Sequence, residues 1–212
     1  MPTTYPVAFP DIAGAVMRPA RFRLSDTVSM LLTNSGVTSH ARVATPVWTL
    51  SLGVDFETVQ AEEDFDRFIQ SVRDALGSVI VGQYGVFCRP RNHSSGMPNA
   101  SAADTTGLVA STEGLTVDIV DVDPNLSLAE ADLVGFEKDG ARGLGILQEA
   151  SPPGSSSRTL TLRPAPRGPA FAAGATVRFV DPKLKMRIAA ASYSPATGYF
   201  GSASLDLVEV AI

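Results

Sequence analysis

Residues 47–81 read VWTLSLGVDFETVQAEEDFDRFIQSVRDALGSVIV, and this stretch predicts a strand, a helix and a second strand. Val47–Val54 alternates apolar and polar residues, as a half-buried strand does. A helix is predicted from about Val59 to Leu76, because apolar residues there recur at the spacing of one helix face. Ser78–Val81 is a short apolar run that predicts the second strand. The apolar helix positions are Phe65, Phe68, Ile69, Val72 and Leu76.

The ends of this predicted helix carry their own signals. Thr58 is a good N-cap residue, and Gly77 stands where a helix commonly ends in a left-handed residue. Acidic residues precede basic ones along the helix, which complements the helix dipole. The acidic residues are Glu62, Glu63, Asp64 and Asp66, and the basic ones are Arg67 and Arg73.

Short strands account for most of the remaining chain. The segments before residue 47 and after residue 182 that predict strands are Arg21–Leu24, Val28–Thr33, Ser39–Val43, Lys183–Ala191 and Gly201–Ile212. Turn residues separate six further candidates, and such a series suggests a small antiparallel barrel or sandwich. These are Gly107–Ser111, Leu115–Val120, Asp132–Glu137, Gly143–Glu149, Arg158–Arg163 and Thr176–Val180.

The composition changes at Arg89, where a polar, loop-like stretch begins. We therefore predict a mainly β fold with one amphipathic helix and two domains. Residues 1–88 and 183–212 form the first domain, and residues 89–182 form a small β-barrel inserted into it. Such insertions are tolerated because the ends of loops and chains often lie close together.

The composition limits the classes of function. Hydrophobic residues make up 44% of the 212 residues, which is enough to bury a core. The net charge of −5 disfavours nucleic-acid binding by a charged surface. Cys88 is the only cysteine, so no disulfide forms within the chain and no multi-thiolate metal site is expected. We expect neither a Sec-type signal peptide nor membrane insertion, because no suitable apolar run is present.

Residues that could carry chemistry are few and scattered. His40 and His93 are far apart in sequence and do not match the spacing of a metal site. Cys88 has only His93 near it in sequence, which does not match a nucleophile site. Asp121 and Asp123, with Asp118 before them, could hold a divalent ion. We favour a simpler reading, in which a strand ends in the turn at residues 123–125.

Charged clusters have simple interpretations as well. Glu62, Glu63, Asp64 and Asp66 could include an acid/base pair, but a solvated helix face is favoured. Lys183, Lys185 and Arg187 alternate and so share one face of a strand, which could contact phosphate, an acidic neighbour or solvent. A similar short basic group is Arg18, Arg21 and Arg23. The nucleophile elbow, the P-loop and the dinucleotide-binding glycine motif are absent. We therefore predict no catalytic, cofactor or metal site, and no enzyme activity.

Four features together resemble the distal tail proteins of long-tailed bacteriophages, within the broad family of tail-tube-like structural proteins. They are the strand Pro19–Leu24, the strand Val47–Leu52 with Trp48, the helix Phe65–Leu76 ending at Gly77, and the closing strand Ser202–Val210. An inserted β domain between the helix and the closing strands is similar to this family too, where it is often OB-fold-like or galectin-like.

The resemblance implies a structural role in the virion. Such proteins form a hexameric ring at the tail tip, assembled in the bacterial host cytoplasm, that joins the tail tube protein to the hub protein and lines the DNA channel. The inserted domain would project as a collar or as a platform for a fibre or receptor-binding protein. Six copies of a chain of net charge −5 would carry −30, so an acidic lumen would let DNA pass without specific binding. The apolar strand Leu205–Ile212 could supply the ring contacts.

Three alternatives remain open at this point. The chain could be a tail tube or tail-completion subunit of a phage-like particle, such as a gene transfer agent or an injection machine. The segment Gly107–Val180 could be a carbohydrate-binding module, although it contains only Phe136, Phe171 and Phe179 as aromatic residues. A hydrolase is the least supported alternative, because no residue set favours it.

Overall fold

A computed structural model describes residues 6–25, 28–32, 38–42, 46–74, 77–84, 90, 106–189, 193–194 and 201–210. It confirms a mainly β fold with one amphipathic α-helix within these residues. The predicted boundary at 88/89 lies outside the described residues, as do Cys88 and His93. The predicted boundary at 182/183 falls directly before the strand β14.

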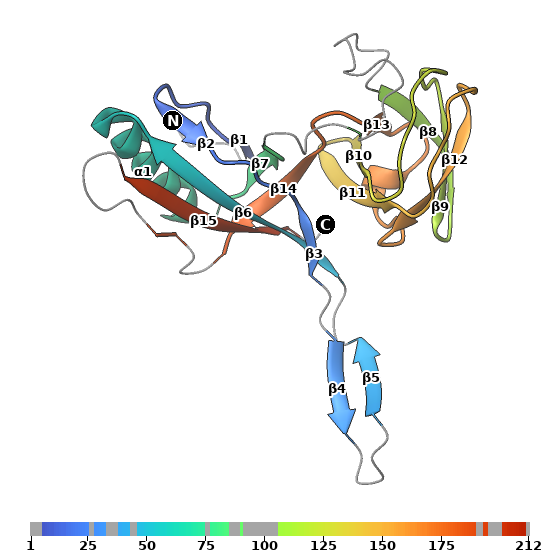
Figure 1. Cartoon of the computed structure of the whole chain (residues 1–212), viewed down its shortest axis with the longest axis horizontal. Coiled ribbons are helices and arrows are strands. Elements are labelled where there is room, and N and C mark those ends of the chain that lie inside the picture. Colours follow the sequence, from blue (N-terminus) through green and yellow to red (C-terminus); the bar gives the residue numbers. More distant parts are fainter. Residues whose placement is uncertain are drawn as a thin grey trace.

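One sheet draws its strands from both ends of the chain (Figure 1). Its order is β1-β7-β14-β15-β6-β2, and β3 also pairs with β6. Only the β1–β7 pair is parallel among these pairs. The strands are β1 (Val7–Ala8), β2 (Ala15–Met17), β3 (Arg23–Ser25), β6 (Val47–Phe56), β7 (Val79–Gly82), β14 (Lys183–Ile188) and β15 (Ser202–Glu209).

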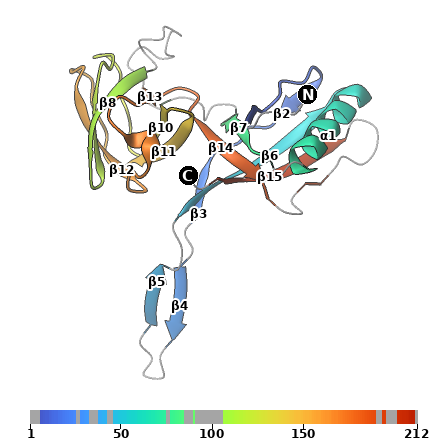
Figure 2. The same ribbon diagram turned by 180° about the vertical axis from the view of Figure 1, so that it is seen from behind.

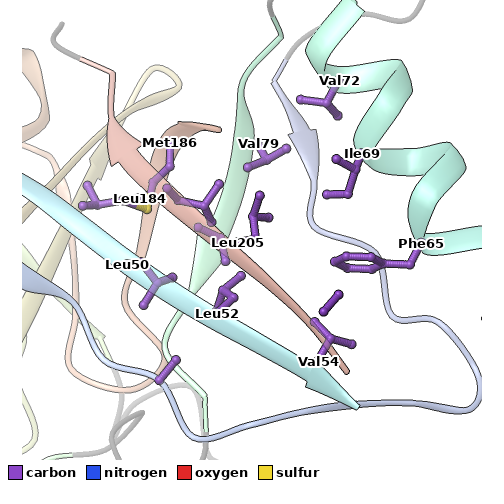
Figure 3. Packing of buried hydrophobic residues seen from close by; sticks show 14 of the residues in the cluster. Leu50, Leu52, Val54, Phe65, Ile69, Val72, Val79, Leu184, Met186 and Leu205 are labelled. Atoms are coloured by element: carbon purple, nitrogen blue, oxygen red, sulfur yellow. The ribbon is translucent and has the colours of Figure 1, made fainter. Parts of the chain in front are cut away.

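Helix α1 (Val59–Asp74) covers one face of this sheet. The predicted end at Leu76 cannot be compared, because residues 75 and 76 lie outside the described part. The Thr58 hydroxyl accepts a hydrogen bond from the Ala61 N–H (3.2 Å), which confirms the predicted N-cap. Figure 3 shows the apolar side chains of α1 pointing at those of the sheet. The fully buried residues at this contact include Phe65, Ile69, Val72, Leu50, Leu52, Val54, Val79 and Leu205.

The burial pattern of strand β6 shows which face of the sheet packs into the core. Its even-numbered residues, from Trp48 to Phe56, are buried in the core, whereas its odd-numbered residues are exposed or half-buried. The period of two places Thr49, Ser51 and Asp55 on the opposite face. We call this opposite side of the sheet the open face.

A second unit is a closed six-stranded antiparallel barrel in the order β10-β11-β12-β9-β8-β13. The barrel confirms the prediction of a small antiparallel barrel, with one strand more than an OB-fold has. Phe136 and Phe171 stack inside it, with ring centres 4.6 Å apart. Its elements are β8 (Thr106–Glu113), β9 (Thr116–Val120), β10 (Leu133–Lys138), β11 (Ala141–Leu147), β12 (Arg158–Arg163), η2 (Pro169–Phe171) and β13 (Thr176–Arg178).

The barrel packs against the sheet through the outer side of β10 and β11. Leu144 is 1% exposed and belongs to the core of the sheet domain, with the half-buried Leu133 and Ile146 beside it. Gly135 lies so close to Pro182 that an added Cβ would stand 2.8 Å from the proline Cβ. The two units therefore share one apolar contact immediately before β14.

Strands β4 (Val28–Leu32) and β5 (Thr38–Arg42) form a separate two-stranded hairpin. Their pairing confirms two of the predicted strands. In Figures 1 and 2 the hairpin extends away from both the sheet and the barrel. An isolated two-stranded hairpin is marginally stable in water.

The half-buried carboxyl group of Glu209 predicts that the stability of the fold depends on pH. Glu209 accepts a hydrogen bond from the Trp48 N–H (3.1 Å), and burial raises the pKa of its carboxyl group despite that bond. A raised pKa in the folded state makes the fold less stable as pH rises from the ordinary pKa through the raised one. We expect Glu209→Gln to gain stability over the wild type as pH rises through this window, measured by urea unfolding between about pH 4 and about pH 7. Glu113→Gln on the barrel controls for the loss of one charge, and parallel profiles for the wild type and Glu209→Gln would contradict the account.

Candidate functional surfaces

The open face brings residues of both predicted basic groups onto one surface. In β14, Leu184 and Met186 are buried, so Lys183, Lys185 and Arg187 point to the open face, as their alternation predicts. Directly paired residues of neighbouring strands share a face. The register places Arg187 opposite Val208, Val208 opposite Thr49, and Thr49 opposite Arg23.

Two cations of the open face are neutralised within the chain. Arg18 donates two hydrogen bonds to Asp55 (2.5 and 2.9 Å), and its aliphatic stem lies over Gly53. The hydrogen bond from Arg18 holds the pKa of the Asp55 carboxyl below its ordinary value. Lys183 forms an ion pair with Asp181 (3.2 Å). These pairs are exposed, so they contribute little to stability.

Three other cations of the open face make no ion pair within the described part of the chain. They are Arg23, Lys185 and Arg187, and Arg23 and Arg187 are exposed. Half-buried Val208 and Val210 lie beside the two cations of β14. We define the basic patch as Arg23, Lys185 and Arg187 with these two valines.

The acidic residues of α1 do not form an acid/base pair. Asp64 accepts hydrogen bonds from Gln60 (3.0 Å) and Arg67 (2.7 Å). Asp66 is half-buried, and this burial raises the pKa of its carboxyl group. Glu62 and Glu63 make no ion pair with any described residue, in line with the predicted solvated face.

The aspartates around residue 121 do not converge on an ion. Asp118 accepts hydrogen bonds from Ser111 (2.5 Å) and Thr159 (2.6 Å), and these bonds lower the pKa of its carboxyl group. Asp123 instead accepts the Asn125 N–H (2.7 Å), which is the turn that we favoured. Among the described residues, no group of three His, Cys, Asp or Glu side chains could hold a metal ion.

The barrel carries a shallow depression of about 340 Å³ beside β12. It is lined by residues 149–155 and 158–161, which include no aromatic side chain of the kind that sugar sites use as a platform. Arg158, which sequence reasoning missed, is buried there and donates to four backbone carbonyls. The acceptors are Ser155 (2.9 Å), Leu126 (2.6 Å), Asp123 (3.0 Å) and Pro124 (3.3 Å).

These contacts give Arg158 a structural role, because its guanidinium holds the loop of residues 123–126 against β12. We expect Arg158→Met to lower the free energy of unfolding by about 2–4 kcal/mol, since several charge-assisted hydrogen bonds are lost. Arg158→Lys keeps the charge but lacks the planar guanidinium group, so it should lower the free energy of unfolding by nearly as much. Chemical denaturation measures both, with exposed Arg167→Met as the control, and an unchanged midpoint for Arg158→Met would contradict the assignment.

None of the helices of the described residues has the length and apolar character needed to cross a bilayer. Comparison with known proteins adds no relative: no family model matches the chain, and no curated protein matches it either. The features that bear on function are therefore the basic patch, the projecting hairpin and the arrangement of the two units.

Proposed function

We propose that this protein is a structural component of a phage-type tail, the distal tail protein, without catalytic activity. Six copies form a ring that joins the tail tube protein above to the tail-tip hub protein below. The sheet domain lines the DNA channel, and DNA passes without specific binding. The barrel points outward, where it serves as a collar or holds a fibre or receptor-binding protein.

The projecting β4–β5 hairpin is the observation that carries this proposal. It leaves the sheet between β3 and β6, which are themselves paired at Ser25 and Val47. A short turn would suffice to join these two residues, yet the chain inserts residues 26–46 at this point. A two-stranded hairpin is marginally stable by itself, and contacts with a further element would support it. An assembly subunit has such contacts, whereas a free binding module does not need them.

The arrangement of the two units supports the same role. The chain leaves the sheet after β7 and returns at β14, so the barrel is attached at one end of the sheet domain. The barrel can thus vary or bind a partner without disturbing the sheet. Its contact with the sheet through Leu144 is apolar, which holds the barrel in a defined orientation.

Negative-stain imaging of the purified chain tests the proposal against its closest alternative. A distal tail protein should give single closed rings, because its two ring faces bind different partners. A tail tube or tail-completion subunit of a phage-like particle should stack into longer tubes instead. Gold-labelled antibody against the barrel should then mark the tip of intact tails, and labelling along the whole tail would contradict the distal position.

A further inference from the structure

The basic patch lies on a sheet that offers little backbone for pairing with another chain. The edges of the sheet are β1, with two residues, and β2 and β3, with three each. Edge strands this short discourage strand-to-strand association. Contacts between this domain and another chain are therefore expected to use side chains and not strand pairing.

The basic patch combines charged side chains with two half-buried valines. Arg187, Val208, Thr49 and Arg23 form one row across four strands, and Lys185 lies two residues from Arg187 on β14. Cations that are left unpaired around half-buried valines fit an acidic surface with an apolar centre.

The same chain carries a surface of that kind at the start of α1. Val59 is 53% exposed and places an apolar side chain on the surface there. Glu57 precedes it, and Glu62 and Glu63 follow at three and four residues, so both lie next to Val59 on the helix surface. Glu57, Glu62 and Glu63 form no ion pair within the described residues. We define the acidic patch as these three glutamates with Val59.

The two patches lie at opposite ends of the sheet domain. Thr49 belongs to the basic row, and Phe56 ends β6 just before the acidic patch, seven residues or about 23 Å further along the strand. Figures 1 and 2 agree that α1 lies at the end of the sheet remote from β3. A patch and its complement on different surfaces of one chain allow head-to-tail contacts, which close into a ring if the rotation permits.

We infer that the basic patch of one copy docks on the acidic patch of the next copy. This inference rests on the proposed ring and names one of the contacts that would build it. The three cations meet the three carboxylates, and Val208 and Val210 meet Val59. A second copy fits better than nucleic acid, because phosphates would leave the valines uncovered and because the chain as a whole has a net charge of −5.

Charge reversal in the full-length chain tests the contact. We expect Lys185→Glu/Arg187→Glu to weaken self-association on the order of 100-fold, measured by sedimentation velocity over a concentration series. Glu57→Lys/Glu63→Lys should weaken it similarly. An equimolar mixture of the two variants should associate again, because every contact in an alternating assembly is then attractive. Added salt should weaken association of the wild type.

Arg167→Glu is the matched control, because Arg167 is exposed on the barrel and far in sequence from both patches. Zero-length cross-linking of a mixture of labelled and unlabelled wild-type chains should join Lys185 of one copy to Glu62 or Glu63 of another.

Failure of the patch contact can be distinguished from failure of the ring itself. Rings that persist after charge reversal, or variants that do not rescue each other, would overturn the patch contact and leave the ring itself intact. A wild-type chain that never associates and gives no such cross-link would overturn the contact. A DNA duplex that binds the wild type but not Lys185→Glu/Arg187→Glu, while self-association is unaffected by these substitutions, would assign the basic patch to nucleic acid instead.

Discussion

Phe65→Ala is expected to lower the free energy of unfolding by about 3–5 kcal/mol, which is the cost of removing a fully buried aromatic side chain. Phe65 is 0% exposed and lies where α1 meets the sheet. Its ring centre is 5.5 Å from that of Phe56, 6.1 Å from that of Phe9 and 6.2 Å from that of Tyr193. The substitution therefore leaves a cavity among three aromatic rings from separate parts of the chain.

Such a loss is a large share of the stability of a domain, which is typically about 5–15 kcal/mol. Urea unfolding followed by tryptophan fluorescence measures it directly, because Trp48 is buried in the same core. Gln70→Ala on the exposed side of α1 is the control and should change the value by less than about 0.5 kcal/mol. A loss below about 1 kcal/mol for Phe65→Ala would contradict the packing of α1 on the sheet.

Removal of the β4–β5 hairpin is expected to abolish assembly while leaving both units folded. Ser25 and Val47 are directly paired, so Asn-Gly can replace residues 26–46 as a two-residue turn between them. Because the hairpin extends away from the sheet and the barrel, the variant should retain the unfolding midpoint of the wild type. The expected change is in mass alone, from an oligomer to a monomer in light scattering.

The control for this variant keeps the hairpin and shortens a different connection. Replacing the exposed two-residue turn Asp139-Gly140 between β10 and β11 with Gly alone alters the barrel without touching the hairpin. This change should leave the oligomer unchanged. A hairpin-free chain that still forms the wild-type oligomer would show that the hairpin is not part of the assembly contact.

Local periodicity was sufficient to predict the sheet and helix at the centre of the fold. Trp48, Leu50 and Leu52 alternate along β6, and Phe65, Ile69 and Val72 recur at helical spacing, so each element shows its buried face in its own sequence. The alternation of Lys183, Lys185 and Arg187 likewise predicted a shared face.

The bounds of β11 were predicted less well, as Gly143–Glu149 rather than Ala141–Leu147. The reason is that residues 143–147 of β11 are glycine or apolar on both faces, so they show no polar alternation. Its inward positions include Gly143 and Gly145, where Phe171 and Leu162 from other elements occupy the space of a side chain. Its outward positions include Leu144, which packs against the sheet domain.

The surfaces that carry the functional proposals depend on tertiary contacts that no local pattern contains. The register across β14, β15, β6 and β3 places Arg187 and Arg23 in one row, although they are far apart in the chain. The role of Arg158 depends on carbonyls more than thirty residues away in sequence. The hairpin projects because, among the described strands, β4 and β5 pair only with each other. A strand pattern in the sequence does not reveal which strands pair.

The mass of the full-length chain in solution tests the central claim most directly. Light scattering across a concentration series should approach six copies of the 22.2 kDa chain, or about 133 kDa, with closed rings in images of the same sample. A mass of one copy at every concentration, with no rings in the images, would contradict the ring that the proposed function requires.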